Sequence, residues 1–576
     1  MTIQSGFPQL TVVTEVVARF AGKTSVIAGR GVDYPHRGCV SFKSMESIHP
    51  LPFESIILEP PVSEWPIGLS EMSHIALREL RQQARTRLVN SAEQFVLRLS
   101  DVARCVGLMS GNRPLLTGDP STTPIVMTGH QPVIFHSGLT FKYQTVEAFA
   151  VQHGLIAMAV VIDTDEGDAG AFLYPTADTS RGSSQVTSGN GIPKILSKSM
   201  SLARSHGLFS GSRLKAREVL SPALSVLEND LRACGKESVA KAFQEFASPY
   251  AALAEISPGG FSAMEANLIT RWNADIGGRM LELPLSAICS FPEFIRFTAP
   301  ILERPFEFAQ CYNQTLTTFR TEHRIRNEAN PFPNLTLEDD WCELPFWVVD
   351  HTAGSRHVLQ VRRELDGMTL VCNRERLLTR QKGNVTEALT SLLFAGQQLV
   401  PRGALITATL RLLFSDLFVH GTGGGQYDPC TDALIRNWWS EEPSPFAVAS
   451  ASRFLFGDER QKLLQLQHVE SQLRDMQYNP QRLLGTNVFP AALEESLTSL
   501  LREKEAAVKQ MKSARQSGES AETIGRQIQR IAEEIKVEVS QEFEPQLQEL
   551  RSLTDQNLTT ITSRTWPWFL FPDQTP

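Results

Sequence analysis

The segment from residue 125 to residue 168 constrains the fold of this chain more than any other. A short apolar run at 125–127 ends in a glycine turn, a helical pattern covers 137–153, and a second apolar run at 155–162 ends in acidic residues. A buried strand, a turn, a helix and a second buried strand form the pattern of a parallel βαβ unit. The sequence therefore predicts an α/β fold with a Rossmann-like parallel sheet. In such a fold the ligand crevice lies at the carboxyl ends of the strands.

Polar residues gather where the first predicted strand ends and the helix begins. A glycine after a strand lets the backbone approach a ligand closely, and the amides that open a helix favour an anion. His130 and His136 could donate to a phosphate or carboxylate or transfer a proton, and Lys142 could reach the same anion from one helical turn beyond Gly138. A structural turn with capping groups is the other interpretation. The predicted site residues here are Thr128, Gly129, His130, Gln131, His136, Ser137, Gly138 and Lys142.

The second predicted strand ends in a cluster of carboxylates. Asp163, Asp165 and Glu166 could hold a ribose hydroxyl, a substrate amine or Mg²⁺, and a solvated turn is the alternative. A calcium-binding EF-hand loop is excluded, because the glycine comes one position too early and Tyr174 stands where the final glutamate would be. Apart from this possible Mg²⁺ role, the sequence predicts no metal site.

A second glycine-rich turn lies late in the chain. A helical pattern at 403–415 and apolar residues at 417–419 precede it, and another helical pattern follows. The turn matches neither the dinucleotide-binding fingerprint nor a Walker A loop, whose lysine is missing. Its amides predict a nest for an anion, with close packing of strand against helix as the alternative. The predicted site residues are His420, Gly421, Gly423, Gly424, Tyr427 and Asp428, with His420 joining His130 and His136 as candidate catalytic residues.

Charge and cysteine usage narrow the class of partner. The 576 residues carry 55 basic and 63 acidic side chains, a net charge of −8, so no overall basic field exists to bind nucleic acid or an anionic membrane. No apolar stretch approaches the roughly 18 residues of a membrane span, and no secretory signal is visible. The eight cysteines form no C-x-x-C pair. We expect a cytoplasmic protein that acts on a small molecule.

The patterns divide the chain into three parts. Residues 1–120 form a mixed N-terminal arm with helices expected at 72–85 and 91–106, residues 121–455 form the Rossmann-like core, and residues 456–576 form a helical hairpin with an apolar tail. Within the core we expect a flexible stretch at 176–212, a helical insertion at 214–340, and strands at 343–349, 358–361 and 369–372.

Residues 458–557 have the pattern of an antiparallel coiled-coil hairpin. Four isoleucines repeat every three or four positions, a spacing near 3.5 that makes an apolar stripe suited to a partner helix. They are Ile524, Ile528, Ile531 and Ile535. The stripe could pair within one chain or between two, and we expect a homodimer through this hairpin. The apolar tail at 565–572 is expected to dock on the body or to cover a dimer interface.

The order of these motifs resembles that of the bacillithiol biosynthesis cysteine-adding enzymes (BshC). The stretch from Thr128 to Leu139 is similar to the family's T-G-Q-Q segment, with His130 in place of one of its glutamines. The acidic tip resembles its E-D-x-D segment. Arg402 with the glycine turn up to Tyr427 resembles its late glycine loop, without the Pro-Gly-Glu core. The motifs are similar over residues 120–175 and 400–440. Over the rest of the chain only the architecture is similar.

The resemblance implies a Rossmann-like core related to class I synthetases and nucleotidyltransferases, with a coiled coil used for dimerisation. It implies a ligase that adds cysteine to the amine of glucosaminyl-malate. Forming an amide from a carboxylate requires activation, so an adenine nucleotide is a candidate cofactor. His130 or His420 would transfer the proton, and Arg402 would belong to the binding site. Two alternatives remain open: an Mg²⁺-dependent nucleotidyltransferase, and a scaffold whose core has lost its chemistry.

Overall fold

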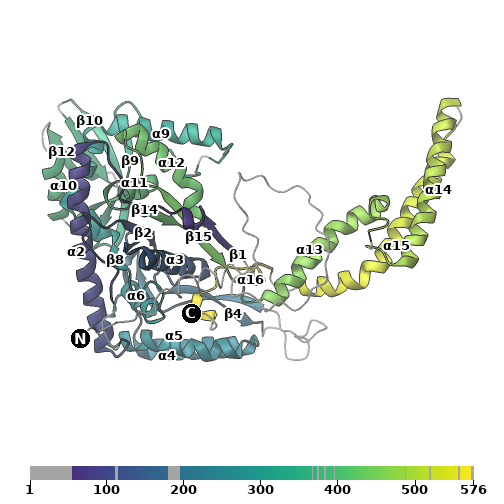
Figure 1. The fold of residues 1–576 in the computed structure, drawn as a ribbon, viewed down its shortest axis with the longest axis horizontal. Coiled ribbons are helices and arrows are strands. Elements are labelled where there is room, and N and C mark those ends of the chain that lie inside the picture. The colour runs from purple at the N-terminus through teal and green to yellow at the C-terminus, as the bar shows by residue number, and fades with distance from the viewer. Residues whose placement is uncertain are drawn as a thin grey trace, which may run out of the picture.

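The computed structural model describes residues 55–109, 114–178, 195–257, 259–327, 329–365, 367–372, 375–381, 385–394, 396–486, 488–517, 520–554 and 558–571. These residues form a body built mainly on a six-stranded and a five-stranded sheet, from which a helical arm projects to one side (Figure 1). Within them, no helix combines the length and the apolar character needed to cross a membrane.

The central sheet is mostly parallel. Its strands, in their order across the sheet, are β1 (Ser55–Glu59), β15 (Phe446–Ser452), β14 (Leu417–His420), β2 (Ile125–His130), β3 (Ile156–Val161) and β8 (Leu281–Pro284). Only β1 is antiparallel, where it pairs with β15 at one edge. The five parallel strands follow the doubly wound order 3-2-1-4-5 when they are counted along the chain, which is the order of a Rossmann-like sheet.

Helices cover both faces of this sheet, which is why its strands are mostly apolar. Every residue of β3 is buried. Helix α3 (Ser137–His153) connects β2 to β3 and packs with Val126, Ala157 and Val419 on one face. The opposite face is covered by α2 (Ile75–Cys105), α11 (Ala404–Leu413) and α12 (Thr422–Trp439). Strand, turn, helix and strand at 125–162 therefore form the βαβ unit that the sequence predicts.

The N-terminal part that is described is joined closely to the core. The sequence predicts two helices here, whereas the structure has the single helix α2, because no glycine or proline interrupts residues 86–90 and Leu88 and Val89 are buried. Arg81 and Arg85 of α2 bind both carboxylate oxygens of buried Asp416, at 2.8 and 2.7 Å. The first 54 residues of the predicted arm lie outside the described residues.

The described parts of 176–212 mostly form strands, whereas the sequence predicts a flexible stretch there. It contains most of two hairpins, formed by β4 (Ala171–Ala177) with β5 (Ile195–Ser201) and by β6 (Ala203–His206) with β7 (Leu208–Leu214). Alternate apolar side chains, among them Tyr174 and Ile195, are buried and hold these strands despite the many serines. Residues 179–194 lie outside the described residues.

The predicted helical insertion contains one strand of the central sheet. Helices α4 (Arg217–Ala233), α5 (Glu237–Leu253) and α6 (Ala263–Asn273) precede β8, and α7 (Leu285–Cys289), α8 (Pro292–Glu303) and α9 (Pro305–Glu322) follow it. Strand β8 has four residues, too few for a period to be recognised.

An antiparallel sheet follows, and its first three strands contain the three predicted segments. Its strands are β9 (Trp341–Asp350), β10 (Ser355–Glu364), β11 (Gly367–Cys372), β12 (Glu375–Gln381) and β13 (Gln397–Pro401), in the order β12-β11-β10-β9-β13. Along the chain, helix α10 (Val385–Phe394) connects β12 to β13.

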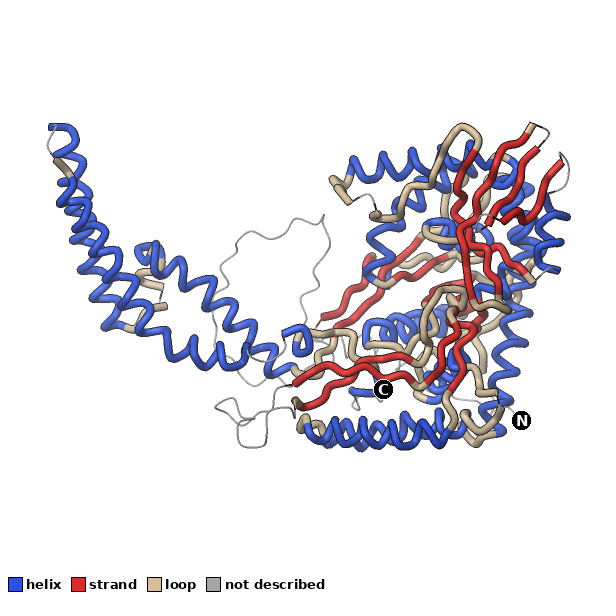
Figure 2. The backbone as a smooth tube through the Cα atoms, turned by 180° about the vertical axis from the view of Figure 1, so that it is seen from behind, coloured by secondary structure: helices blue, strands red, loops and turns tan. Residues whose placement is uncertain are grey.

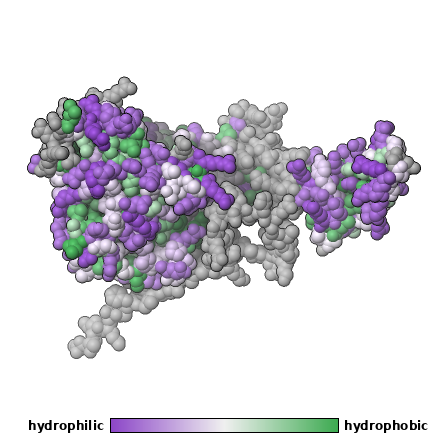
Figure 3. Space-filling view, turned by 90° about the horizontal axis from the view of Figure 1, so that it is seen from above, coloured by the Kyte–Doolittle hydropathy of each residue, from purple (hydrophilic) through white to green (hydrophobic). Residues whose placement is uncertain are grey.

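The arm consists of α13 (Gly457–Tyr478), α14 (Ala491–Ser517) and α15 (Glu522–Thr554), seen from behind in Figure 2. Ile531 and Ile535 are buried against Leu497 of α14, and Met476 of α13 joins the same core. The stripe thus pairs within one chain. On the face seen in Figure 3, hydrophilic residues dominate the surface of the arm. The homodimer expected through the hairpin stays a prediction.

After the arm the chain returns to the body. A single turn, α16 (Leu558–Ile561), is followed by the tail, in which Trp566, Phe569 and Leu570 are buried. The ring of Phe569 stacks on that of Phe246 in α5, with centroids 3.7 Å apart. The described end of the chain therefore docks on the body, between β4 and α5 in Figure 1.

Candidate functional site

The two predicted polar motifs meet at the point where the strand order of the central sheet reverses. From β2 the chain moves in one direction to β3 and β8, and it returns on the other side of β2 to form β14 and β15. Thr128 lies opposite Val419 in the pairing of β2 with β14, and its buried hydroxyl Oγ1 donates to the Val419 carbonyl at 2.8 Å. His130 and His420 are the last residues of these neighbouring strands. A ligand crevice is expected at this position in an open α/β sheet.

Lys142 is buried beside the end of β2. Its side chain is held by the sheet, because Nζ donates to the carbonyl of Gly129 at 3.0 Å. Within the described part of the chain, no carboxylate lies within ion-pair distance of this amine, and burial lowers the pKa of Lys142 to about 7. A buried amine without a counter-charge is costly to protonate, so an anion in the crevice would stabilise its charged form.

The two histidines of the first motif are uncharged near neutral pH. Burial, followed by the charge of Lys142, lowers the pKa of His130 to about 3, and its Nδ1 lies 3.1 Å from the Gln131 carbonyl. Burial, followed by the charges of Arg564 and Lys142, lowers the pKa of His136 to about 4. Nδ1 of His136 accepts from the amide of Gly138 at 3.1 Å, so His136 is the N-cap of α3.

The late glycine motif, predicted as a turn between a strand and a helix, forms the first turn of that helix. Helix α12 begins at Thr422, and Gly421 is its N-cap residue. A Cβ at Gly424 would lie 2.6 Å from Nδ1 of His420, and one at Gly425 would lie 2.2 Å from a methyl of Val448. A Cβ at Gly421 or Gly423 would meet nothing within 4 Å. Close packing thus accounts for two of the glycines, while the first-turn amides of α12 remain without intrahelical acceptors.

His420 is oriented by a buried carboxylate. Its Nε2 lies 2.9 Å from Oδ2 of Asp428, the seventh residue of α12, and this carboxylate also binds Arg411 at 2.6 Å. Burial by itself raises the pKa of Asp428, but the hydrogen bond and charge of His420 and the charge of Arg411 outweigh it and hold the pKa below its ordinary value. An ionised carboxylate only accepts, so Nε2 carries the proton, and Nδ1, which keeps its lone pair, faces Gly424.

The acids after β3 do not form a metal-ligand cluster, which is one of their three predicted roles. Asp163 is buried and accepts from the amide and hydroxyl of Ser286 at 3.0 and 2.5 Å; burial, opposed by these bonds, raises its pKa. Asp165 accepts from Gln131 Nε2 at 3.0 Å and pairs with Arg356. Glu166 is exposed, 4.0 Å from the same guanidinium. Because Asp163 and Asp165 already have partners, the arrangement does not fit Mg²⁺. The described residues contain no cluster of three or more potential metal ligands.

The other predicted residues occupy three kinds of position. Gly138 packs closely, since a Cβ there would lie 3.0 Å from the Ala451 carbonyl of β15, and Ser137 is fully buried beside it. Tyr427 is half-buried next to Asp428 on α12. Arg402 contacts the antiparallel sheet instead: it pairs with Glu343, and its guanidinium lies 4.9 Å from the ring centroid of Trp347.

Sequence reasoning missed several residues that shape this edge. Arg356 neutralises Asp165 from 191 residues away and Ser286 binds Asp163 from 123 residues away, whereas Arg411 binds Asp428 from 17 residues away. Arg564 approaches from the tail, where the amide of Trp568 donates to the Phe135 carbonyl at 2.8 Å. No motif surrounds these residues in the sequence, so only the fold assigns them.

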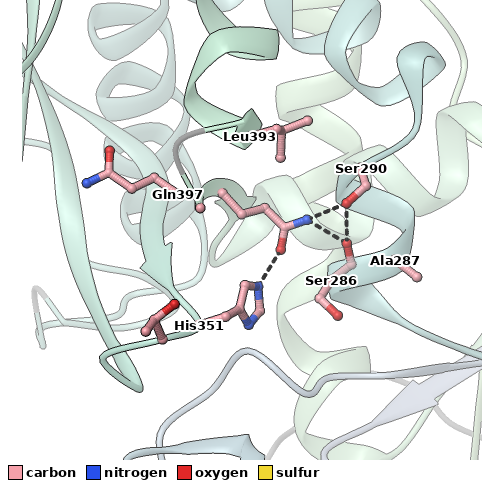
Figure 4. Close-up of a pocket in the computed structure, with 9 residues that line it drawn as sticks. Ser286, Ala287, Ser290, His351, Leu393 and Gln397 are labelled. Carbon is pink, nitrogen blue, oxygen red and sulfur yellow. Dashed lines mark hydrogen bonds between the residues drawn. The ribbon is translucent and has the colours of Figure 1, made fainter.

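A cavity of about 480 Å³ lies further along the same edge, next to β8 (Figure 4). Ser286 and Ser290 of the α7 region form one side, and His351 of the β9–β10 loop faces them. Gln398 of β13 lies between and bonds to both sides. This cavity has no counterpart among the sequence predictions.

The fold and this edge define an α/β protein with a Rossmann-like, mostly parallel six-stranded sheet. In comparisons with known proteins, no family model matches the sequence and no curated protein matches it.

Proposed function

We propose that this protein is a ligase that forms a carbon–nitrogen bond between an amino acid, with cysteine as the first candidate, and a small amine. The observation that carries the proposal is the pairing of His420 with Asp428 on the strand next to the one that holds the buried amine of Lys142. The end of β14 thus presents a base, His420, and a cation, Lys142, lies beside the end of the neighbouring strand β2.

The cation side suits a substrate carboxylate or a phosphate. Lys142 lacks a carboxylate partner among the described residues, and the first-turn amides of α12 lack intrahelical acceptors. An anion within reach of both groups would satisfy them. A nucleotide phosphate fits this position as well as a carboxylate does, and a nucleoside triphosphate would supply the activation that amide formation requires.

The base side suits proton removal from the attacking amine. In the proposed step the amine nitrogen attacks the activated carboxyl carbon, the new C–N bond forms, and the bond from that carbon to its leaving group breaks. The proton released by nitrogen passes to Nδ1 of His420, while Asp428 stabilises the resulting imidazolium. His130, held neutral by burial, is the second candidate for this proton.

The Mg²⁺-dependent nucleotidyltransferase alternative has less support. It requires Asp163, Asp165 and Glu166 to converge on a metal ion, whereas Asp163 binds Ser286 and Asp165 binds Arg356 and Gln131.

The test is product formation by the full-length protein. Purified protein is incubated with cysteine, a nucleoside triphosphate and a panel of small amines including glucosaminyl-malate, and products are sought by mass spectrometry as the sum of both substrates minus water. We expect a thiol-containing amide with the wild type and none with the His130→Ala/His420→Ala double variant. Thiol profiles of cells with and without the protein give a second readout. Full turnover by the double variant, or no amide from any amine, would contradict the proposal and favour a scaffold role.

A further inference from the structure

We propose that the cavity beside β8 is a second ligand site and that it takes an uncharged, hydroxyl-rich small molecule, a polyol. It lies where the parallel sheet, through α7, meets the antiparallel sheet, through β13 and the β9–β10 loop (Figure 4). Its volume of about 480 Å³ falls in the range of small-molecule sites, which occur preferentially between such structural units.

The polar side of the cavity is fixed before any ligand binds. The side-chain amide of Gln398, only 5% exposed, donates to the Ser286 carbonyl at 2.6 Å and to Ser290 Oγ at 2.8 Å. Its carbonyl oxygen lies 2.9 Å from Nε2 of His351. This bond places the proton of a neutral His351 on Nε2 and leaves Nδ1 as an acceptor. The walls are therefore braced against one another, which lowers the entropic cost of binding.

The charge of the surroundings selects against anions. None of the nine residues that line the cavity is a lysine, arginine, aspartate or glutamate. Two described carboxylates adjoin the wall: buried Asp163 already accepts both donors of Ser286, and Asp350 accepts from the amides of Thr352 and Ala353 at 2.9 and 2.8 Å. A phosphate or carboxylate would lose its hydration here without gaining a cation. A ligand cation would not gain an available carboxylate either, because Asp163 and Asp350 already accept hydrogen bonds.

Hydroxyl groups match the groups that remain. A hydroxyl both donates and accepts, so it can donate to Nδ1 of His351 and accept from the hydroxyl of Thr352. Ala287 and Leu393 give the cavity an apolar part against which the C–H groups of a polyol can pack.

This site is separate from the switch-point crevice. The cavity adjoins the end of β8, which is two strands away from β2 across the sheet, about 10 Å at the usual strand spacing. The inference therefore does not depend on the proposed ligase reaction.

Binding is measured on the full-length protein by saturation-transfer NMR, with D-glucose and myo-inositol as the probes and inorganic phosphate as the anion. We expect saturation transfer to at least one polyol, and at least a tenfold loss of affinity in Ala287→Trp, which fills the cavity without removing a hydrogen bond. Ala233→Trp, on the exposed end of α4, is the matched control and should bind as the wild type does. Thr352→Trp, at an exposed loop position, repeats the block if Ala287→Trp does not fold.

Three results would overturn the inference. They are the absence of transfer to either polyol, unchanged polyol binding in a folded blocking variant, and competition between phosphate and polyol at this cavity. Loss of ligase activity alone would bear on the proposed function and not on this site.

Discussion

The hydroxyl of Thr128 donates to the carbonyl of Val419 at 2.8 Å, across 291 residues of sequence. This bond joins the two strands on either side of the switch point. It brings the glycine turn after β2 and the first turn of α12 to one edge of the sheet. The candidate site depends on this juxtaposition.

Asp428→Asn should impair catalysis beyond its effect on folding. The amide no longer fixes the proton on Nε2 of His420, so we expect kcat for cysteine ligation to fall about 100-fold, with KM little changed. Asp432→Asn is the control, because Asp432 also binds Arg411, at 2.6 Å, but is not bonded to His420. Urea unfolding should show that both variants lose stability, Asp428→Asn by about 3 kcal/mol. Equal kcat in the two variants would remove the orienting role.

Lys142→Met should raise stability near neutral pH while weakening anion binding. The folded pKa of about 7 lies below that of an unfolded lysine, about 10.4, so unfolding takes up a proton between these values. The free energy of unfolding of the wild type therefore rises with pH across this window and is flat below it. Over three pH units the rise is on the order of 4 kcal/mol.

The measurement is urea unfolding at several pH values between 6 and 10, the range set by these pKa values. Lys142→Met should lack the slope that Lys142 contributes, and calorimetry should find phosphate binding weakened at least tenfold. Lys512→Met, at an exposed position of α14, should keep both properties of the wild type. A slope that survives in Lys142→Met would show that another group titrates.

Gly424→Ala and Gly423→Ala separate close packing from helix propensity. A Cβ at Gly424 would press on Nδ1 of His420 at 2.6 Å, so we expect ligation to fall at least tenfold and thermal stability to decrease. A Cβ at Gly423 would meet nothing within 4 Å, so Gly423→Ala should stabilise α12 by up to about 1 kcal/mol. Equal activities in the two variants would argue against His420 as the base.

Arg564→Gln should raise the pKa of His136. The guanidinium is the second of the effects that lower this pKa, after burial, and removing its positive charge favours the protonated imidazole. The pKa is measured by NMR on histidine-labelled protein. Arg515→Gln, at an exposed position of α14, makes the same charge change far from His136 and should leave the pKa unchanged. A value unmoved by Arg564→Gln would place the tail charge too far away to matter.

Local sequence patterns determined much of the fold. The continuous apolar runs around residues 125–162 indicated a buried parallel βαβ unit, since strands covered on both faces need apolar residues throughout. The repeat of isoleucines indicated the helical arm. Both are properties of neighbours along the chain, and periodicity reports them directly. Strand β8 was not predicted, because a strand of four residues is too short to show a period.

Tertiary structure alone decided what the polar residues do. The acids after β3 have the composition of a ligand cluster, but Ser286 and Arg356 bind two of them from distant segments. The sequence indicates Lys142 as a possible anion contact, but only the fold shows that it is buried and that none of the described carboxylates pairs with it. A side chain's charge and availability depend on its desolvation and on partners across the fold, and neither is encoded in its neighbours along the chain.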